Sequence, residues 1–143
     1  PRTGSSARSR NAWGSFETDP TIRMTYIRFQ SSEISPYTGR KYGVFVAVWH
    51  LVRDKRVTED EETEYWRQRE WFEENLPIPP FYAEGNPQRA VTWFKREALT
   101  DEMKTRLTFY LSLGSRYGIM FEEETADSFT EIIYEDPYQI AVI

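Results

Sequence analysis

The sequence predicts an α+β fold, a two-layer sandwich in which three helices pack on one face of an antiparallel-rich sheet. Two observations carry this prediction. Segments with the two-residue period of half-buried strands lie near both ends of the chain, and three segments with helical spacing lie between them. An amphipathic helix buries its apolar stripe against another element, and a sheet offers a matching apolar face. At 143 residues the chain fits one domain.

The domain is predicted to occupy residues 24–143, because the residues before it have a different character. Residues 1–10 are rich in Arg, Ser and Gly and lack periodicity, whereas an alternating run begins at Met24. We interpret residues 1–23 as a flexible N-terminal arm or as a remnant of an expression tag. A basic arm can bind nucleic acid, but the acidic body argues against nucleic acid as a partner.

The first half of the domain is predicted to contain one strand and two helices. Residues 24–30 alternate large and polar side chains, as a half-buried strand does, and a segment with Pro and Gly ends this run. Residues 41–54 place apolar side chains at helical spacing, although their valines make a strand the competing interpretation. Thr58 and Glu61 have the spacing of a capping box, which predicts a second helix over 59–75.

The second half begins with a stiff loop at residues 77–87, which contains four prolines. Residues 90–95 are rich in β-branched and aromatic side chains and are predicted to form a short strand. Thr100 is a good N-cap for a third helix that ends near Gly114. Three strands joined by tight turns follow as an antiparallel meander, at 119–125, 130–135 and 138–142.

Net negative charge is concentrated at the C-terminal end of the domain. Residues 24–116 carry fourteen basic and fourteen acidic side chains, which cancel, whereas residues 117–143 carry seven carboxylates and no Lys or Arg. The seven are Glu122, Glu123, Glu124, Asp127, Glu131, Glu135 and Asp136. Such a segment is suited to meeting a positively charged surface, or to keeping the protein in solution.

Four of these glutamates are predicted to share one face of the sheet. Glu122 and Glu124 are two residues apart in one expected strand, and Glu131 and Glu135 lie at same-face spacing in the next. If those strands are neighbours, the four carboxylates point outward together. Adjacent like charges destabilise a sheet by some tenths of a kcal/mol per pair. Lysines mixed among the glutamates would keep the protein soluble without this repulsion, so the all-acidic pattern favours a binding role.

Aromatic residues make up 16% of the chain, and most of them are expected to form the core. Trp66, Trp93 and Phe94 are interpreted in this way. Phe81 and Tyr82 differ because they follow prolines in a loop, where an aromatic pair can anchor a partner.

Several kinds of chemistry have no support in the sequence. The chain has no Cys and a single His, His50, so it cannot form a disulfide and has no classical zinc site of its own. It contains no phosphate-binding glycine motif and no nucleophile elbow, so no catalytic, cofactor-binding or metal-binding residue is assigned. No apolar run is long enough to span a membrane, and a cytoplasmic location is expected.

Three segments resemble those of a family of small hypothetical bacterial proteins. They are WFEENLP at 71–77, AVTWFK at 90–95 and YEDPYQ at 134–139. The resemblance extends over most of residues 24–143 and implies a bacterial or mobile-element origin. It implies no activity, ligand or partner.

These observations favour a small, soluble, acidic interaction protein that is not an enzyme and needs no cofactor. It would dock a basic protein partner through the acidic sheet face, as an immunity protein or a decoy does. The alternative is a divalent-metal-dependent enzyme built from carboxylates, with Asp136 joining Glu122 and Glu124 around Mg²⁺ or Ca²⁺. This alternative lacks a nearby Lys or His to activate water, because residues 117–143 contain neither.

Overall fold

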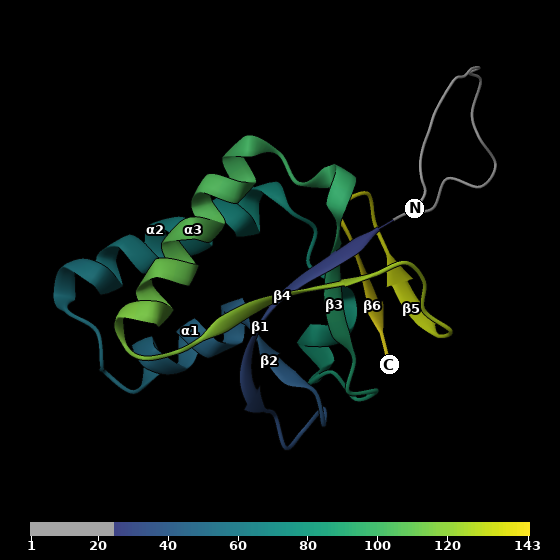
Figure 1. The fold of residues 1–143 in the computed structure, drawn as a ribbon, viewed down its shortest axis with the longest axis horizontal. Coiled ribbons are helices and arrows are strands. Elements are labelled where there is room, and N and C mark those ends of the chain that lie inside the picture. Colours follow the sequence, from purple (N-terminus) through teal and green to yellow (C-terminus); the bar gives the residue numbers. More distant parts are fainter. Residues whose placement is uncertain (1–24) are drawn as a thin grey trace.

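The computed structural model describes residues 25–143, so the interpretation of residues 1–23 lies outside the described part (Figure 1). Within it, three α-helices and a six-stranded antiparallel sheet confirm the predicted α+β fold. In chain order the elements are β1 (Tyr26–Ile34), β2 (Lys41–Gly43), α1 (Val44–Arg53), α2 (Glu59–Asn75), η2 (Pro80–Glu84), β3 (Val91–Lys95), η3 (Arg96–Ala98), α3 (Asp101–Arg116), β4 (Phe121–Ala126), β5 (Ile132–Glu135) and β6 (Gln139–Val142). No helix in the described residues is long and apolar enough to cross a membrane.

The helices begin where local capping chemistry predicts. The capping box of α2 is present: the Thr58 backbone N–H donates to Glu61 Oε1 at 2.8 Å, and the Glu61 N–H donates to Thr58 Oγ1 at 3.1 Å. The Thr100 hydroxyl likewise accepts from the Met103 N–H at 3.1 Å and starts α3. The predicted start of the helix at residues 41–54 is wrong. Residues 41–43 form the short strand β2, and α1 begins at Val44.

The sheet is built around β1 and is forked on one side. β4 pairs with β1 along one edge, from Tyr26 opposite Ala126 to Ser31 opposite Phe121. On its other edge, β1 pairs first with β3, at Tyr26 and Ile27, and then with β2, from Gln30 onward. The strands β3, β6 and β5 complete the sheet in that order. β2 and β3 thus share one edge of β1 and diverge from each other.

The predicted meander of three C-terminal strands is wrong. β5 and β6 form a hairpin, but β4 pairs with β1 and lies at the opposite end of the sheet from β5. The reason is non-local: β1 offers β4 a partner over six residue pairs, and Phe121 then packs against the helical core. Phe129, in the β4–β5 connection, covers Tyr26 and Trp93 on the side of the sheet away from the helices.

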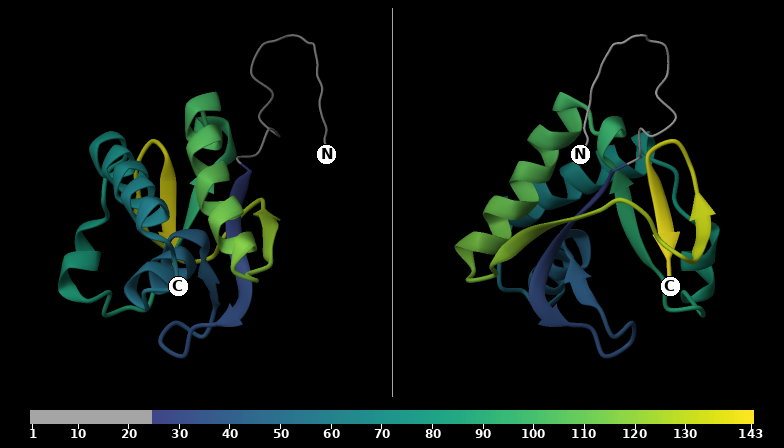
Figure 2. Two further views of the ribbon diagram at one scale, coloured as in Figure 1. Left: turned by 90° about the vertical axis from the view of Figure 1, so that its left-hand side faces the viewer. Right: turned by 45° about the vertical axis from the view of Figure 1, so that its right-hand side comes forward.

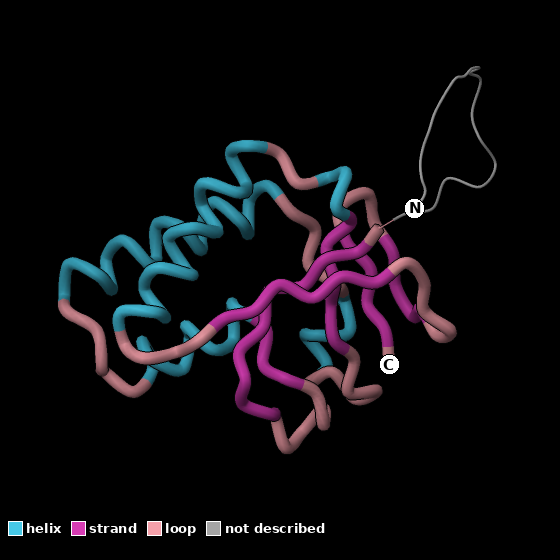
Figure 3. The backbone as a smooth tube through the Cα atoms, in the orientation of Figure 1, coloured by secondary structure: helices cyan, strands magenta, loops and turns pink. Residues whose placement is uncertain are grey.

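The three helices lie together to one side of the strands (Figures 2 and 3). The main core joins Ile27 and Phe94 of the sheet to apolar residues of all three helices. Trp93 and Phe94 are buried, as predicted, whereas Trp66 is 44% exposed. This exposed indole lies beside the cavity described next.

Candidate ligand-binding cavity

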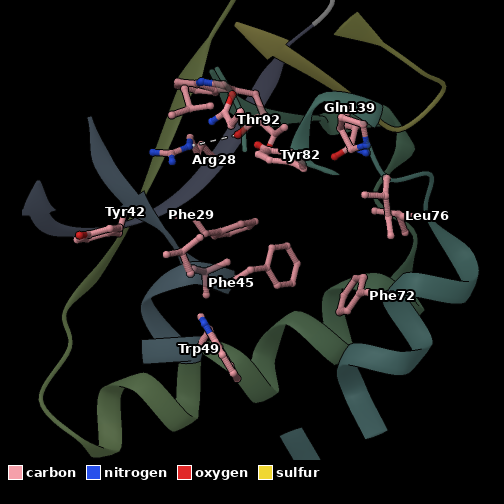
Figure 4. A pocket seen from close by; sticks show the side chains of 18 of the residues that line it. Arg28, Phe29, Tyr42, Phe45, Trp49, Phe72, Leu76, Tyr82, Thr92 and Gln139 are labelled. Carbon is pink, nitrogen blue, oxygen red and sulfur yellow. Dashed lines mark hydrogen bonds between the residues drawn. The ribbon is translucent and has the colours of Figure 1, made fainter. Parts of the chain in front are cut away.

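A cavity of about 900 Å³ lies between the helices and the forked part of the sheet (Figure 4). This volume is in the range of sites that hold small molecules. Its lining comes from β1, β2 and the turn between them, β3, α1, α2, the 77–86 loop, Tyr110 of α3 and Gln139 of β6. Most of the wall is aromatic or aliphatic, including Phe29, Phe45, Trp49, Phe72, Leu76 and Phe94.

Arg28 occupies the fork between β2 and β3. Its Nε donates to the Thr92 carbonyl of β3 at 3.2 Å, and its Nη1 donates to the Lys41 carbonyl of β2 at 2.9 Å. Nη1 also donates to Gln30 Oε1 at 2.8 Å. The guanidinium thereby satisfies backbone carbonyls on both diverging strands.

The charge of Arg28 has no counterion in the described residues. The side chain is only 8% exposed, it forms no ion pair there, and its Nη2 donates no hydrogen bond to a described residue. Burial lowers the pKa of Arg28 from its usual value, because a desolvated guanidinium is less stable. An arginine nevertheless keeps its proton in proteins, so the cavity is lined by a buried cation.

The other charged side chains that line the cavity are paired. Lys41 Nζ lies 2.7 Å from Glu122 Oε2, and Arg69 Nε lies 3.1 Å from Glu73 Oε2. In the described part of the chain, Arg28 is therefore the one lining charge without an opposite charge beside it.

A second polar group, the Tyr110 hydroxyl, also borders the cavity and has no hydrogen-bond partner in the described residues. Tyr110 is 2% exposed, and its ring packs edge-on against Phe45, Phe72 and Tyr65, with centroids 4.9, 5.8 and 6.0 Å away. Its hydroxyl makes no hydrogen bond to a described residue and is not fully buried, whereas the Tyr65 hydroxyl accepts a hydrogen bond from Arg69 Nη1 at 3.3 Å. Burial raises the pKa of Tyr110, so its hydroxyl stays protonated at neutral pH.

The mouth of the cavity exposes apolar surface. Of the nine large apolar residues exposed in the described part of the chain, five line this cavity: Tyr37, Val46, Trp66, Ile78 and Tyr82. Exposed apolar residues that gather at one place mark a binding surface more often than scattered ones do.

The structure separates the four glutamates that the sequence placed together. Glu122 and Glu124 lie on β4, whereas Glu131 precedes β5 and Glu135 lies on it, at the other end of the sheet. Their expected common face is therefore wrong, because the two strands are not neighbours.

Two of these glutamates are also engaged in ion pairs. Glu122 Oε2 accepts from Lys41 Nζ at 2.7 Å and from Gln30 Nε2 at 2.9 Å, and the lysine bond lowers the pKa of Glu122. Glu135 Oε2 accepts from Lys95 Nζ at 2.5 Å. These lysines are distant in sequence, so counting charges along residues 117–143 could not reveal them.

The remaining candidate residues, Phe81, Tyr82 and Asp136, mainly contact other parts of the fold. The Phe81 and Tyr82 rings contact each other in η2, tilted by 41° with centroids 4.6 Å apart, and of the two only Tyr82 lines the cavity. Asp136 Oδ1 accepts from the Tyr138 and Gln139 N–H groups at 2.8 and 3.1 Å, which forms a turn. No group of three or more His, Cys, Asp or Glu side chains that could hold a metal ion occurs in the described residues.

Sequence reasoning missed Arg28 and Tyr110, which give the cavity its unpartnered polar atoms. Tyr110 falls within the third predicted helix, and no local pattern distinguishes a cavity hydroxyl from a core ring. For Arg28 one signal existed, a cation between Ile27 and Phe29 in the strongest strand pattern of the chain. Comparison with known proteins adds no further assignment, because no family model, curated protein or solved structure matches the chain.

Proposed function

We propose that the protein is a non-enzymatic binding module that holds a small, largely apolar molecule in this cavity. The observation that carries the proposal is the cavity itself, about 900 Å³ with aromatic walls and an exposed apolar mouth. Ligand sites are concave, mostly apolar clefts of about 300–1,000 Å³, and this open cavity has both the size and the lining of such a site. Each Å² of apolar surface that a ligand removes from water contributes about 25 cal/mol.

Binding is favoured over catalysis by the kinds of residue that line the cavity. The lining residues in the described part include no His, Cys or Asp, which most often perform nucleophilic or acid–base chemistry near neutral pH. Its one lining carboxylate, Glu73, is held by Arg69.

The proposal can be tested with 1-aminoanthracene, a neutral aromatic probe whose fluorescence rises in apolar surroundings. We expect saturable binding with one probe per chain. Leu76→Trp places a larger side chain in the cavity wall and should weaken binding at least about tenfold. The matched control is Met120→Trp, since Met120 is 77% exposed and does not line the cavity. Non-saturable binding, or equal binding by the two variants, would refute the proposal.

We propose in second place that a basic protein partner docks on β4, in the manner of an immunity or decoy interaction. β4 is an edge strand whose residues 122–125 are all exposed, and three of them are glutamates. An edge strand leaves backbone groups free to pair with another chain, and complementary charge selects the partner. Glu131 and Glu135 no longer belong to this surface, because they lie at the other end of the sheet.

This second proposal predicts binding that depends on salt and on one strand only. A lysine-rich peptide should bind at low ionic strength, and Glu123→Gln with Glu124→Gln should abolish binding. The matched pair Glu131→Gln with Glu135→Gln should leave it unchanged. Equal losses in both pairs would show a general charge effect and would exclude a site on β4.

A further inference from the structure

The unpartnered Nη2 of Arg28 lies beside the start of helix α1. Gly43 is the N-cap of this ten-residue helix, and no side chain caps it. A Cβ atom built on Gly43 would lie 3.2 Å from Nη2. The first N–H groups of a helix have no partner within the helix and carry partial positive charge. A buried cation and a helix N-terminus therefore meet at the cavity wall.

Gly43 keeps this place open. Its φ and ψ of −69° and 164° are accessible to any residue, so the backbone does not require a glycine. The consequence of the glycine is steric, because a side chain at this position would crowd Nη2.

The acidic residue opposite Arg28 in the sheet register does not neutralise it. Glu124 is its register partner across β1 and β4, yet the two form no ion pair, because the guanidinium turns into the fork toward Thr92 and Lys41. Among the described residues, Arg28 donates to two backbone carbonyls and one amide oxygen, all uncharged. A buried cation without a counterion is costly, and an anionic ligand would remove that cost.

We propose that the ligand is a monocarboxylate with an aromatic or aliphatic body, and that its carboxylate binds Arg28 Nη2 and the first backbone N–H groups of α1. This inference rests on the proposed binding function. A monoanion suits a largely apolar cavity, because a phosphate dianion brings a second charge that is costly to remove from water.

The rest of the cavity suits the body of such a molecule. Figure 4 shows Arg28 and Thr92 on one side and Phe45 and Phe72 on the other, so an apolar body would lie against these rings. Tyr110 packs on both rings, and its free hydroxyl could bind a polar atom at the far end of the ligand.

The test compares three molecules with one body on the unmodified protein. 2-Naphthylacetate, 2-naphthylacetamide and 2-naphthyl phosphate would each be titrated as competitors of 1-aminoanthracene. We expect the acid to bind about tenfold to a hundredfold more tightly than the amide, as a charged hydrogen bond requires, and more tightly than the phosphate. Amide binding equal to acid binding, or tighter phosphate binding, overturns the carboxylate subsite while binding in the cavity stands. Failure of 1-aminoanthracene itself to bind refutes the underlying function as well.

Gly43→Ala supplies a second test, because it retains Arg28 and the hydrogen bonds that Arg28 donates to β2 and β3. The added methyl group should reduce acid affinity to near that of the amide and leave amide affinity unchanged. A folded variant, verified by circular dichroism, that retains the full preference for the acid would also overturn the subsite. Arg28→Met is less suitable, because it removes the hydrogen bonds that hold both branches of the fork.

Discussion

Replacing Tyr110 with Phe should make the unliganded protein more stable. Tyr110 is 2% exposed as a whole residue, and its hydroxyl borders the cavity and has no hydrogen-bond partner in the described residues. Phe keeps the ring and its contacts with Phe45, Phe72 and Tyr65. Only the polar atom is removed, so the change isolates its desolvation.

The expected gain is about 1 kcal/mol in the free energy of unfolding. A fully buried hydroxyl without a partner costs about 1–3 kcal/mol, and the low end applies here because the Tyr110 hydroxyl is not fully buried and borders the cavity. For a domain of this size, about 1 kcal/mol corresponds to a rise in Tm of about 3–6 °C. Urea denaturation should show a higher midpoint with an unchanged m value.

Tyr65→Phe is the matched control, because the Tyr65 hydroxyl accepts a hydrogen bond from Arg69. Its removal should lower the free energy of unfolding by about 1 kcal/mol. If Tyr110→Phe were as destabilising as Tyr65→Phe, the Tyr110 hydroxyl would have a partner in the unliganded protein. The inference that the Tyr110 hydroxyl is available to hydrogen-bond a ligand would then be wrong.

Three further predictions concern the framework around the cavity. Gly114→Ala should lower the free energy of unfolding by at least about 1 kcal/mol, although alanine favours helices, because its Cβ would lie 2.3 Å from the Phe121 ring; a higher urea midpoint would contradict this. The hydrogen bond from the N-cap backbone lowers the pKa of Glu61 from 4.5 to about 2. The stability that Glu61 contributes is therefore complete above about pH 4.5 and is lost as pH falls toward 2, and Glu61→Gln should flatten thermal stability across that range. Glu122→Gln should leave the urea midpoint almost unchanged, because its ion pair with Lys41 is solvent-exposed; a clearly lower midpoint would show stronger coupling.

The parts of the fold that the sequence predicts correctly are those with local causes. The capping box at Thr58 and Glu61 and the N-cap at Thr100 set the starts of two helices through contacts three residues apart. The α+β class follows from such elements, because their apolar faces have few ways to pack.

The errors are non-local pairings. β4 could pair with β5 through a short turn or with β1 across most of the chain, and both arrangements satisfy the same alternation of side chains. Because β4 pairs with β1, Glu122 forms its ion pair with Lys41, whereas Glu135 pairs with Lys95 at the other end of the sheet. The acidic face therefore depended on one choice of strand partner that periodicity does not determine.

The cavity could not be predicted because its cause is the fork in the sheet. Strand β1 changes partner from β3 to β2 between Ile27 and Gln30, and each diverging strand is left with a carbonyl that needs a donor. Arg28 lies at this change and serves both carbonyls with Nε and Nη1, which leaves Nη2 for the cavity. A lysine has one ammonium group and lacks this planar set of donors, so it could not hold both strands and also face a ligand in the same geometry. The residue that keeps the fork open is thus also the residue that gives the cavity its charge.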